Sequence, residues 1–452
     1  MVSRGNWGGR LGFILAAAGS AIGLGNIWKF PYITGIHGGG AFVLVYLVCI
    51  LIVGLPIMMA EIYFGKMTQK SPVGAFEHFE TESKGFFHYH RAGKAMKPFY
   101  LVGWLGVISA ILVLSFYSVV AGWAWHYLYL SFSGFSGTDA EVTSLFGKLY
   151  VNPYLQLGWH TLMMGITVWI ISKGVSKGIE KASKILMPIL FIILLGLMFY
   201  ALTLSGGMKA VKFMFYPDFS KIDAEGIIQA LGHSFFTLSL GMGAMITYGS
   251  YLKEDVNIVK SSIIISILDT IIALVAGVMI FSIVFSYGLK AASGPSLIFK
   301  TLPVIFAKMP GGQIVAILFF ILLIFAALTS AISLLEVAVS YFVDEKNWTR
   351  KKATIILGFF IYLLGILSAV SSLKIMNESY LDFFDNITTK YFLPVGGLLT
   401  ILVFAYGIDH KSKMEELGFK SWVYFLFNWT IRIITPALLI FIILNKMGLF
   451  KI

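Results

Sequence analysis

The chain has 452 residues, of which 58% are hydrophobic and only 12% are charged. Soluble domains average roughly half apolar and about a quarter charged residues, so this composition excludes an ordinary soluble protein. The net charge of +12 is interpreted as an orientation signal and an affinity for anionic lipid head groups, and not as a sign of nucleic-acid binding.

Apolar stretches recur from one end of the chain to the other. Crossing a bilayer takes about 20 helical residues, and stretches this long and continuous are predicted to be helices. We expect an all-α membrane protein with a single transmembrane domain (residues 1–452) and no soluble domain. About eleven helices are predicted by this length criterion, at residues 11–34, 40–68, 96–130, 157–172, 178–203, 226–252, 258–287, 311–342, 352–372, 379–407 and 421–445.

The first span follows Arg4 and Arg10, and its middle is rich in glycine. It lacks a small-residue cleavage signature, so it is not interpreted as a removed signal peptide. Lys and Arg are more abundant in the loops that share a side with the N-terminus. This positive-inside bias predicts a cytoplasmic N-terminus, and an odd number of spans then places the C-terminus outside.

Patterns typical of enzymes and metal sites are missing from the sequence. The single Cys49 lies in an apolar run and allows no internal disulfide. The histidines do not have zinc-site spacing, and His78, His88 and His90 are better explained as part of an interfacial aromatic belt. No GxSxG, HExxH or P-loop pattern occurs, so we predict that the protein is not an enzyme.

Glycines interrupt two otherwise apolar helices. The first span, AAAGSAIGLGNIWKFPY, contains Gly19, Gly23 and Gly25, and the sixth, FFTLSLGMGAMITYGSY, contains Gly241 and Gly243. Glycine costs about 1 kcal/mol relative to alanine inside a helix, so both clusters predict unwound backbone. Taken alone, the GxxxG-like spacing in the first span also fits close packing between helices.

The positions of the two clusters favour unwinding. Spans one and six are equivalent if spans one to five and six to ten form two repeats, at about residues 11–203 and 226–407, with an extra helix at about 421–445. Interrupted helices at matching positions indicate a transport site near the bilayer midplane, a relation already established from transporters of this architecture.

Five segments together resemble the signature of the neurotransmitter:sodium symporter family. They are GSAIGLGNIWKFPY, GGGAF at 38–42, GLPIMMAEIYFGK at 54–66, FFTLSLGMG and LTSAISLLE. The resemblance covers essentially the whole chain and is strongest to short prokaryotic amino-acid transporters. It implies two inverted five-helix repeats with unwound first and sixth helices. It also implies a cell-membrane symporter that imports hydrophobic or aromatic L-amino acids with sodium by alternating access.

The resemblance implies two sodium sites built from oxygen ligands, which a hard cation prefers. In the second site, Ala326, Thr329 and Ser330 fall at i, i+3 and i+4 and so share a helical face. Without the resemblance, the Thr329 and Ser330 hydroxyls would more often be interpreted as hydrogen bonding between helices. The first site is Ala21, Asn26, Thr237 and Asp269, and the second is Gly19, Ile22, Ala326, Thr329 and Ser330.

Asp269 is predicted to lie inside the membrane, and a carboxylate there usually belongs to a functional site. The alternative is a packing residue that is protonated or forms a salt bridge. The family pattern has asparagine here, and the position that holds a glutamate in some chloride-independent members is Ala273. We expect Asp269 to supply the fixed charge that chloride supplies in animal relatives, so no chloride is expected.

The same resemblance implies a substrate pocket that binds an α-amino acid through its carboxylate and ammonium groups. Monoamine carriers place an aspartate where this chain has Gly23, so the substrate is expected to bring its own carboxylate. Met242 replaces a phenylalanine of a leucine-preferring relative and leaves room for an aromatic side chain. The expected pocket residues are Ser20, Ala21, Leu24, Gly25, Val113, Tyr117, Phe236, Thr237, Ser239, Met242, Ser330 and Leu334.

Gates are also implied by the resemblance. On the cytoplasmic side they are Arg4, Trp7, Tyr251 and Asp344. On the outside, Lys29 stands where arginine is usual, opposite Asp385, and lysine should make a looser pair because it lacks the bidentate fork.

A channel and an intramembrane enzyme are the two alternative classes of function. A channel needs rings of charge or carbonyls, usually with oligomeric symmetry, and an intramembrane enzyme needs a nucleophile with its base or a metal cluster. Neither pattern is found in the sequence. The expected partners are a small amino acid and membrane lipid, with no nucleic acid and no obligate protein partner. The preferred amino acid, the oligomeric state, the number of sodium ions per cycle and any proton countertransport stay open.

Overall fold

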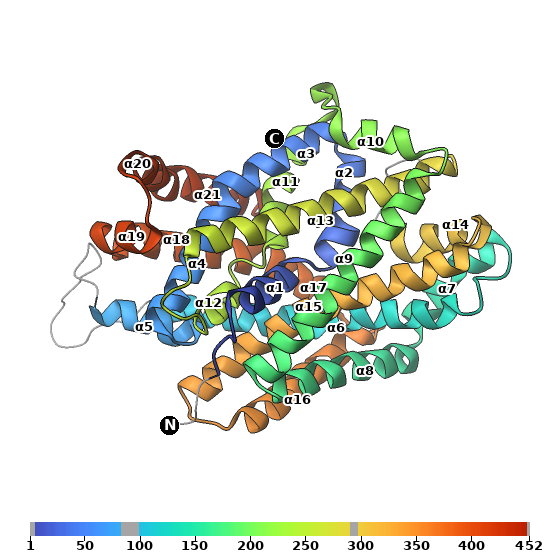
Figure 1. Ribbon diagram of the computed structural model, residues 1–452. Helices are drawn as coiled ribbons and strands as arrows, with labels where there is room; N and C mark the ends of the chain where they lie inside the picture. Colours follow the sequence, from blue (N-terminus) through green and yellow to red (C-terminus); the bar gives the residue numbers. More distant parts are fainter. Residues whose placement is uncertain (1–4, 83–98, 290–296, 450–452) are drawn as a thin grey trace.

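A computed structural model describes residues 5–82, 99–289 and 297–449 (Figure 1). Within these ranges nearly all regular structure is helical. The exception is one hairpin of two short antiparallel strands, β1 (Lys374–Ile375) and β2 (Glu378–Ser379). The predicted all-α class is therefore confirmed.

Eight continuous helical runs of the described chain are long and apolar enough to cross a membrane. Three of them pass through a short π-helical turn between two α-helices. The eight runs contain α3 (Gly40–Cys49) with α4 (Leu55–Thr68), α6 (Tyr100–Ser131), α9 (Lys181–Leu202), α13 (Ile258–Ser286), α15 (Gly312–Asp344), α16 (Arg350–Ala369), α17 (Tyr380–Ile387) with α18 (Leu393–Leu402), and α20 (Ser421–Trp429) with α21 (Thr435–Lys446).

The first and sixth predicted spans are broken, as expected from their glycines. The first consists of α1 (Arg10–Ala21) and, after a π-helical turn, α2 (Phe30–Ile36), and its two parts are bent by 48°. The sixth consists of α11 (Ala224–Thr237) and α12 (Ala244–Gly249). With α8 (Pro153–Ser172), these elements occupy the eleven predicted positions.

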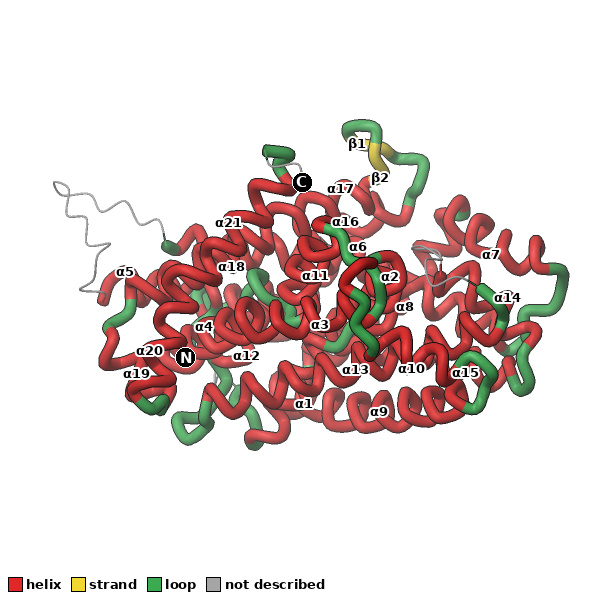
Figure 2. The backbone as a smooth tube through the Cα atoms, turned by 90° about the horizontal axis from the view of Figure 1, so that it is seen from above, coloured by secondary structure: helices red, strands yellow, loops and turns green. Residues whose placement is uncertain are grey.

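Short helices in the connections were not predicted, since their apolar runs are too short for a span. Figures 1 and 2 place α5 and α19 at one end of the bundle and α7 and α14 at the other. The short helices are α5 (Pro72–Glu82), α7 (Asp139–Val151), α10 (Gly207–Phe215), α14 (Leu302–Lys308) and α19 (His410–Leu417), with a 3-10 turn at Phe219–Lys221.

Burial separates central helices from lipid-facing ones. The most apolar stretches of α6 and α15 are 78% and 72% buried inside the protein, whereas those of α9 and of the α20–α21 run are only 28% buried. The helix α1 packs against α9, α13 and α15. The broken first span therefore lies in the interior of the bundle, where its unpaired backbone groups are shielded from lipid.

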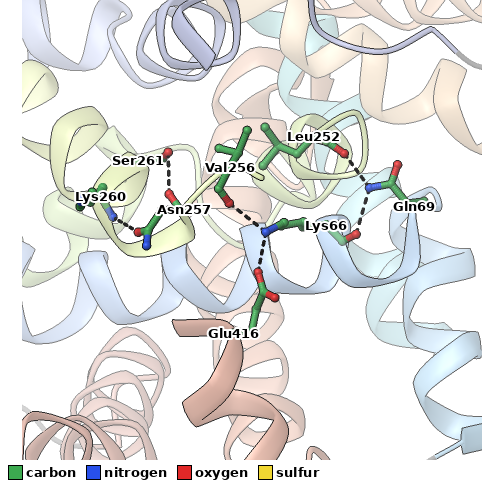
Figure 3. Close-up of polar contacts among 8 residues, drawn as sticks. All are labelled: Lys66, Gln69, Leu252, Val256, Asn257, Lys260, Ser261 and Glu416. Atoms are coloured by element: carbon green, nitrogen blue, oxygen red, sulfur yellow. Dashed lines mark hydrogen bonds and ion pairs between the residues drawn. The ribbon is translucent and has the colours of Figure 1, made fainter. Parts of the chain in front are cut away.

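Polar contacts tie three segments together at the end of the bundle that carries α19 (Figure 3). The ammonium of Lys66, near the end of α4, donates to the Val256 carbonyl at 2.8 Å and pairs with Glu416 of α19 at 2.6 Å. The side-chain amide of Gln69 donates to the Leu252 carbonyl at 2.9 Å. Hydrogen bonds and an ion pair thus connect the end of α4 to α19 and to the segment that joins α12 to α13.

Candidate functional site

One cavity lies between the two helix breaks. All twelve residues predicted for the substrate pocket line it. Gly23 lines it as well, although the sequence prediction did not include Gly23 as a pocket residue. The cavity has a volume of about 30 Å³, which is space for only a few water molecules. An amino acid can enter this conformation only if the walls move.

Three residues with positive φ form the break in the sixth span. Gly241 (+78°) and Gly243 (+75°) adopt a backbone conformation that glycine reaches at little cost. Ser239 (+55°) reaches it despite its side chain. Its hydroxyl donates to the Ser20 carbonyl at 2.8 Å, and this contact joins the break in the sixth span to the end of α1.

The end of α1 supplies backbone groups to the cavity. The Ser20 carbonyl also accepts from the Ser330 hydroxyl at 3.1 Å, and the Leu24 amide donates to the Tyr117 hydroxyl at 3.2 Å. A Cβ atom on Gly23 would lie 2.6 Å from the Ser330 hydroxyl oxygen and 2.9 Å from that of Tyr117. Any side chain at position 23 would therefore have to displace both hydroxyls.

Asp269 lies fully buried on α13, beside this cavity. Its carboxylate accepts from the Asn26 amide at 2.7 Å, from the Thr237 hydroxyl at 3.1 and 3.3 Å, and from the Tyr46 hydroxyl at 3.4 Å. Three of the four residues predicted for the first sodium site are thus in direct contact, and Ala21 ends α1 nearby as a cavity-lining residue.

Tyr46 was missed by sequence reasoning, because a tyrosine in the apolar run YLVC carries no signal of its own. The three side chains that bond to Asp269 are all neutral, so within the described residues the carboxylate has no cationic side chain among its hydrogen-bond partners. Burying an uncompensated charge is costly, and a sodium ion held by carboxylate, amide and backbone oxygens would supply the missing positive charge. The donor set therefore fits the cation that the sequence predicts.

The residues predicted for the second sodium site face one another across α1 and α15. A Cβ on Gly19 would lie 3.1 Å from the Thr329 Cβ atom, so the two helices approach closely there. The Thr329 and Ser330 hydroxyls bond to the Ala326 carbonyl at 3.1 and 3.3 Å. Ile22, at the end of α1, has extended backbone (φ −75°, ψ 98°), so it no longer continues the helix.

Aromatic and charged side chains pack around the residues predicted for the cytoplasmic gate. The Trp7 indole donates to the Tyr248 carbonyl at 2.9 Å and packs edge-on against the ring of Tyr251. The Tyr251 hydroxyl donates to Glu336, which also forms an ion pair with Arg350. The prediction missed Glu336 and Arg350, because nothing in their local sequence links them across α15 and α16. Asp344 ends α15, and Arg4 lies outside the described residues.

The predicted outer gate lines a second cavity, of about 180 Å³, next to the first. Lys29, Asp385 and Phe236 all contribute to its wall. The Lys29 ammonium lies over the Phe236 ring, 4.7 Å from its centroid. Both charged residues belong to the described chain, and they do not come within the 4.0 Å of a direct ion pair. Phe236 separates this cavity from the inner one, since it lines both.

Comparisons with known proteins agree with this geometry. The model of the sodium:neurotransmitter symporter family matches residues 4–138 and 151–451. An uncharacterised sodium-dependent transporter from Bacillus subtilis, YhdH, is 37% identical, with 98% of each chain covered. A rat sodium- and chloride-dependent taurine transporter is 25% identical, over 96% of this chain and 76% of its own.

Among solved structures, the crystal structure of MhsT in complex with L-phenylalanine matches with a TM-score of 0.88 and 42% identity. The match covers 98% of this chain and 100% of that one. The fold and the site define a multi-pass membrane transporter and not an enzyme. The chain belongs to the sodium:neurotransmitter symporter family.

Proposed function

We propose that this protein imports hydrophobic or aromatic L-amino acids together with sodium ions, by alternating access and without chloride. The observation that carries the proposal is the buried Asp269 carboxylate, which has only neutral hydrogen-bond partners and lies beside a cavity lined by unwound backbone. A cation and a zwitterionic substrate together complement these groups.

The substrate's polar end is assigned to the two helix breaks. The amide groups of the α1 break and the Tyr117 hydroxyl would bind the substrate carboxylate, and free backbone carbonyls would bind its ammonium. Because a side chain at position 23 would collide with Ser330 and Tyr117, the protein has no room for a carboxylate of its own there. The substrate therefore brings one.

The substrate's side chain is assigned to the apolar wall of the same cavity. Val113, Met242 and Leu334 are buried there, and the flexible thioether of Met242 can repack around rings of different size. The Phe complex of MhsT is consistent with a subsite of this kind in a relative.

Two sodium ions would bind at the two predicted sets of oxygen ligands. The first lies at Asp269, Asn26 and Thr237 beside the substrate carboxylate, and the second lies between α1 and α15. The Asp269 carboxylate would supply the fixed negative charge beside the first sodium ion, so no added anion would be needed there. Release of the substrate and sodium to the cytoplasm would require that the contacts among Trp7, Tyr251 and Glu336 break.

Equilibrium binding to the purified protein tests the proposal. A scintillation proximity assay with labelled phenylalanine, tryptophan and leucine should show binding in sodium chloride and sodium gluconate alike. Binding should be lost when potassium replaces sodium. Equal affinity in sodium and potassium, or binding only when chloride is present, would overturn it.

The orientation is part of the proposal: the N-terminus and α19 face the cytoplasm, and α7 and the C-terminus face outward. On a Cys49→Ser background, a membrane-impermeant maleimide should label Lys148→Cys in intact cells. It should label Lys411→Cys only after permeabilisation. The reverse pattern would invert the topology.

A further inference from the structure

A basic hollow is lined partly by residues of α10, a helix that lies at the end of the bundle away from α19 (Figure 1). Its volume is about 370 Å³. Three lysines line it, Lys209 and Lys212 from α10 and Lys221 from the following turn, and one carboxylate, Asp218, lies among them. None of these residues contributes to the transport cavity.

Glycines fix the position of α10 against the first span. Gly39 forms an antiparallel bridge with Pro217 and has a φ of +63°, and Gly38 has a φ of +92°. A Cβ on Gly38 would lie 2.9 Å from the Lys221 carbonyl carbon. Glycine is thus required at position 38 by this close approach, which places the turn that carries Lys221 directly against the segment after α2.

Two of the lysines have no anionic partner. Lys221 pairs with Asp218 at 2.9 Å, which leaves Lys209 and Lys212 without an ion pair among the described residues. Their ammonium groups lie instead over aromatic rings, Lys209 at 4.8 Å from the Phe285 centroid and Lys212 at 5.8 Å from that of Tyr216. Both side chains are exposed, so their charges are available to an anion.

Exposed apolar side chains lie beside the hollow. Met208 and Phe215 of α10 are 79% and 54% exposed, as expected for a helix at the membrane interface. Lys212 follows Met208 by four residues and precedes Phe215 by three, so the three side chains share one face of α10. The basic hollow therefore adjoins an exposed apolar surface that acyl chains would cover.

We propose that this hollow binds the head group of an anionic phospholipid. The phosphate oxygens would accept from Lys209 and Lys212, and the acyl chains would lie against the exposed Met208 and Phe215 of α10. These apolar side chains make the occupant a lipid and not free phosphate, which would gain nothing from them. The cluster also departs from the charge bias of the chain, because it places lysines at the end where the positive-inside rule predicts few.

Native mass spectrometry of the full-length protein, titrated with phosphatidylglycerol and with phosphatidylcholine, tests this proposal. Phosphatidylglycerol should bind in preference, and Lys209→Gln/Lys212→Gln should weaken its binding by about 30-fold, since each lysine near an anionic lipid contributes about 1 kcal/mol. Lys209→Arg/Lys212→Arg should retain the binding. The matched control, Lys148→Gln/Lys374→Gln, removes two exposed lysines from α7 and β1 and should bind as the wild type does.

Unchanged sodium-dependent substrate binding shows that the variants are folded. Three results would overturn the proposal: equal binding of both lipids, an equal loss in the control variant, or full displacement of phosphatidylglycerol by millimolar inorganic phosphate. The last result would assign the hollow to a free anion.

Discussion

At the scale of single residues, the proposed mechanism depends on the charge of Asp269. The side chain is fully buried, and amide and hydroxyl groups from three different helical segments donate to it. These neutral groups can orient a carboxylate but cannot neutralise its charge. In the proposed mechanism a sodium ion would do so in the loaded carrier, and another positive charge, such as a proton, would be needed when the empty carrier returns.

Replacing this charge should change the ion requirement. Asp269→Asn keeps the shape and removes the charge, so uptake in sodium gluconate should fall on the order of tenfold, because hydrogen bonds to charged groups contribute about 1.5–3 kcal/mol. Chloride should then restore part of the uptake if it fits near Ala273. Uptake into proteoliposomes, measured in chloride and in gluconate, checks this. Normal chloride-free transport by Asp269→Asn would remove Asp269 from the mechanism.

The size of the side-chain subsite depends on Met242. Met242→Phe inserts a rigid ring into a packed wall, and overpacking costs about 1–3 kcal/mol. Tryptophan binding should therefore weaken roughly tenfold, and leucine binding much less. Competition binding with both amino acids measures the difference. Met208→Phe, at a position 79% exposed on α10, is the matched control and should change neither affinity. Equal weakening of both ligands would place Met242 outside the subsite.

Residues with a local sequence signal could be predicted, and residues without one could not. Asp269 stands out as a carboxylate in an apolar run, and the pocket residues follow from family motifs. Glu336 carries the same signal as Asp269, a carboxylate in an apolar run, but the prediction did not use it. Tyr46 carries no such signal, and its partner Asp269 lies 223 residues away in the sequence. That pairing comes from the tertiary arrangement, which no single stretch of sequence encodes.

At the scale of elements, glycine content predicts where helices unwind. Gly241 and Gly243 adopt positive φ, which explains why the sixth span breaks there and not a turn earlier. The π-helical turns inside three spans have no comparable signature, since they depend on how neighbouring helices pack. The short helix α10 was also missed, because its nine residues are too few to cross a bilayer.

The ion pair between α4 and α19 should stabilise the end of the bundle at which it lies. Lys66 and Glu416 are only 7% and 22% exposed, so their coupling should amount to about 1–2 kcal/mol, more than an exposed pair contributes. A double-mutant cycle with Lys66→Met and Glu416→Gln, followed by thermal unfolding in detergent, measures it. The control cycle on Lys411 and Glu415, which are 80% and 66% exposed and 3.8 Å apart, should give a coupling near zero. Equal couplings in both cycles would contradict a stabilising role for the buried pair.

At the scale of the whole molecule, the broken spans lie inside a bundle that is closed differently at its two ends. The Trp7, Tyr251 and Glu336 contacts close one end, and Phe236 lies between the inner and outer cavities at the other. The positions of the eleven apolar helical segments could be predicted from hydropathy, because lipid demands long apolar helices. The arrangement of those helices around the site required the fold itself.

Sodium-driven accumulation is the central claim of this account, and uptake by reconstituted vesicles tests it most directly. Proteoliposomes loaded with potassium and diluted into sodium gluconate should accumulate labelled phenylalanine transiently above its external concentration. A sodium ionophore should abolish the accumulation, and external potassium in place of sodium should give none. Accumulation that is equal in sodium and potassium, or uptake that stops at the external concentration despite the sodium gradient, would contradict it.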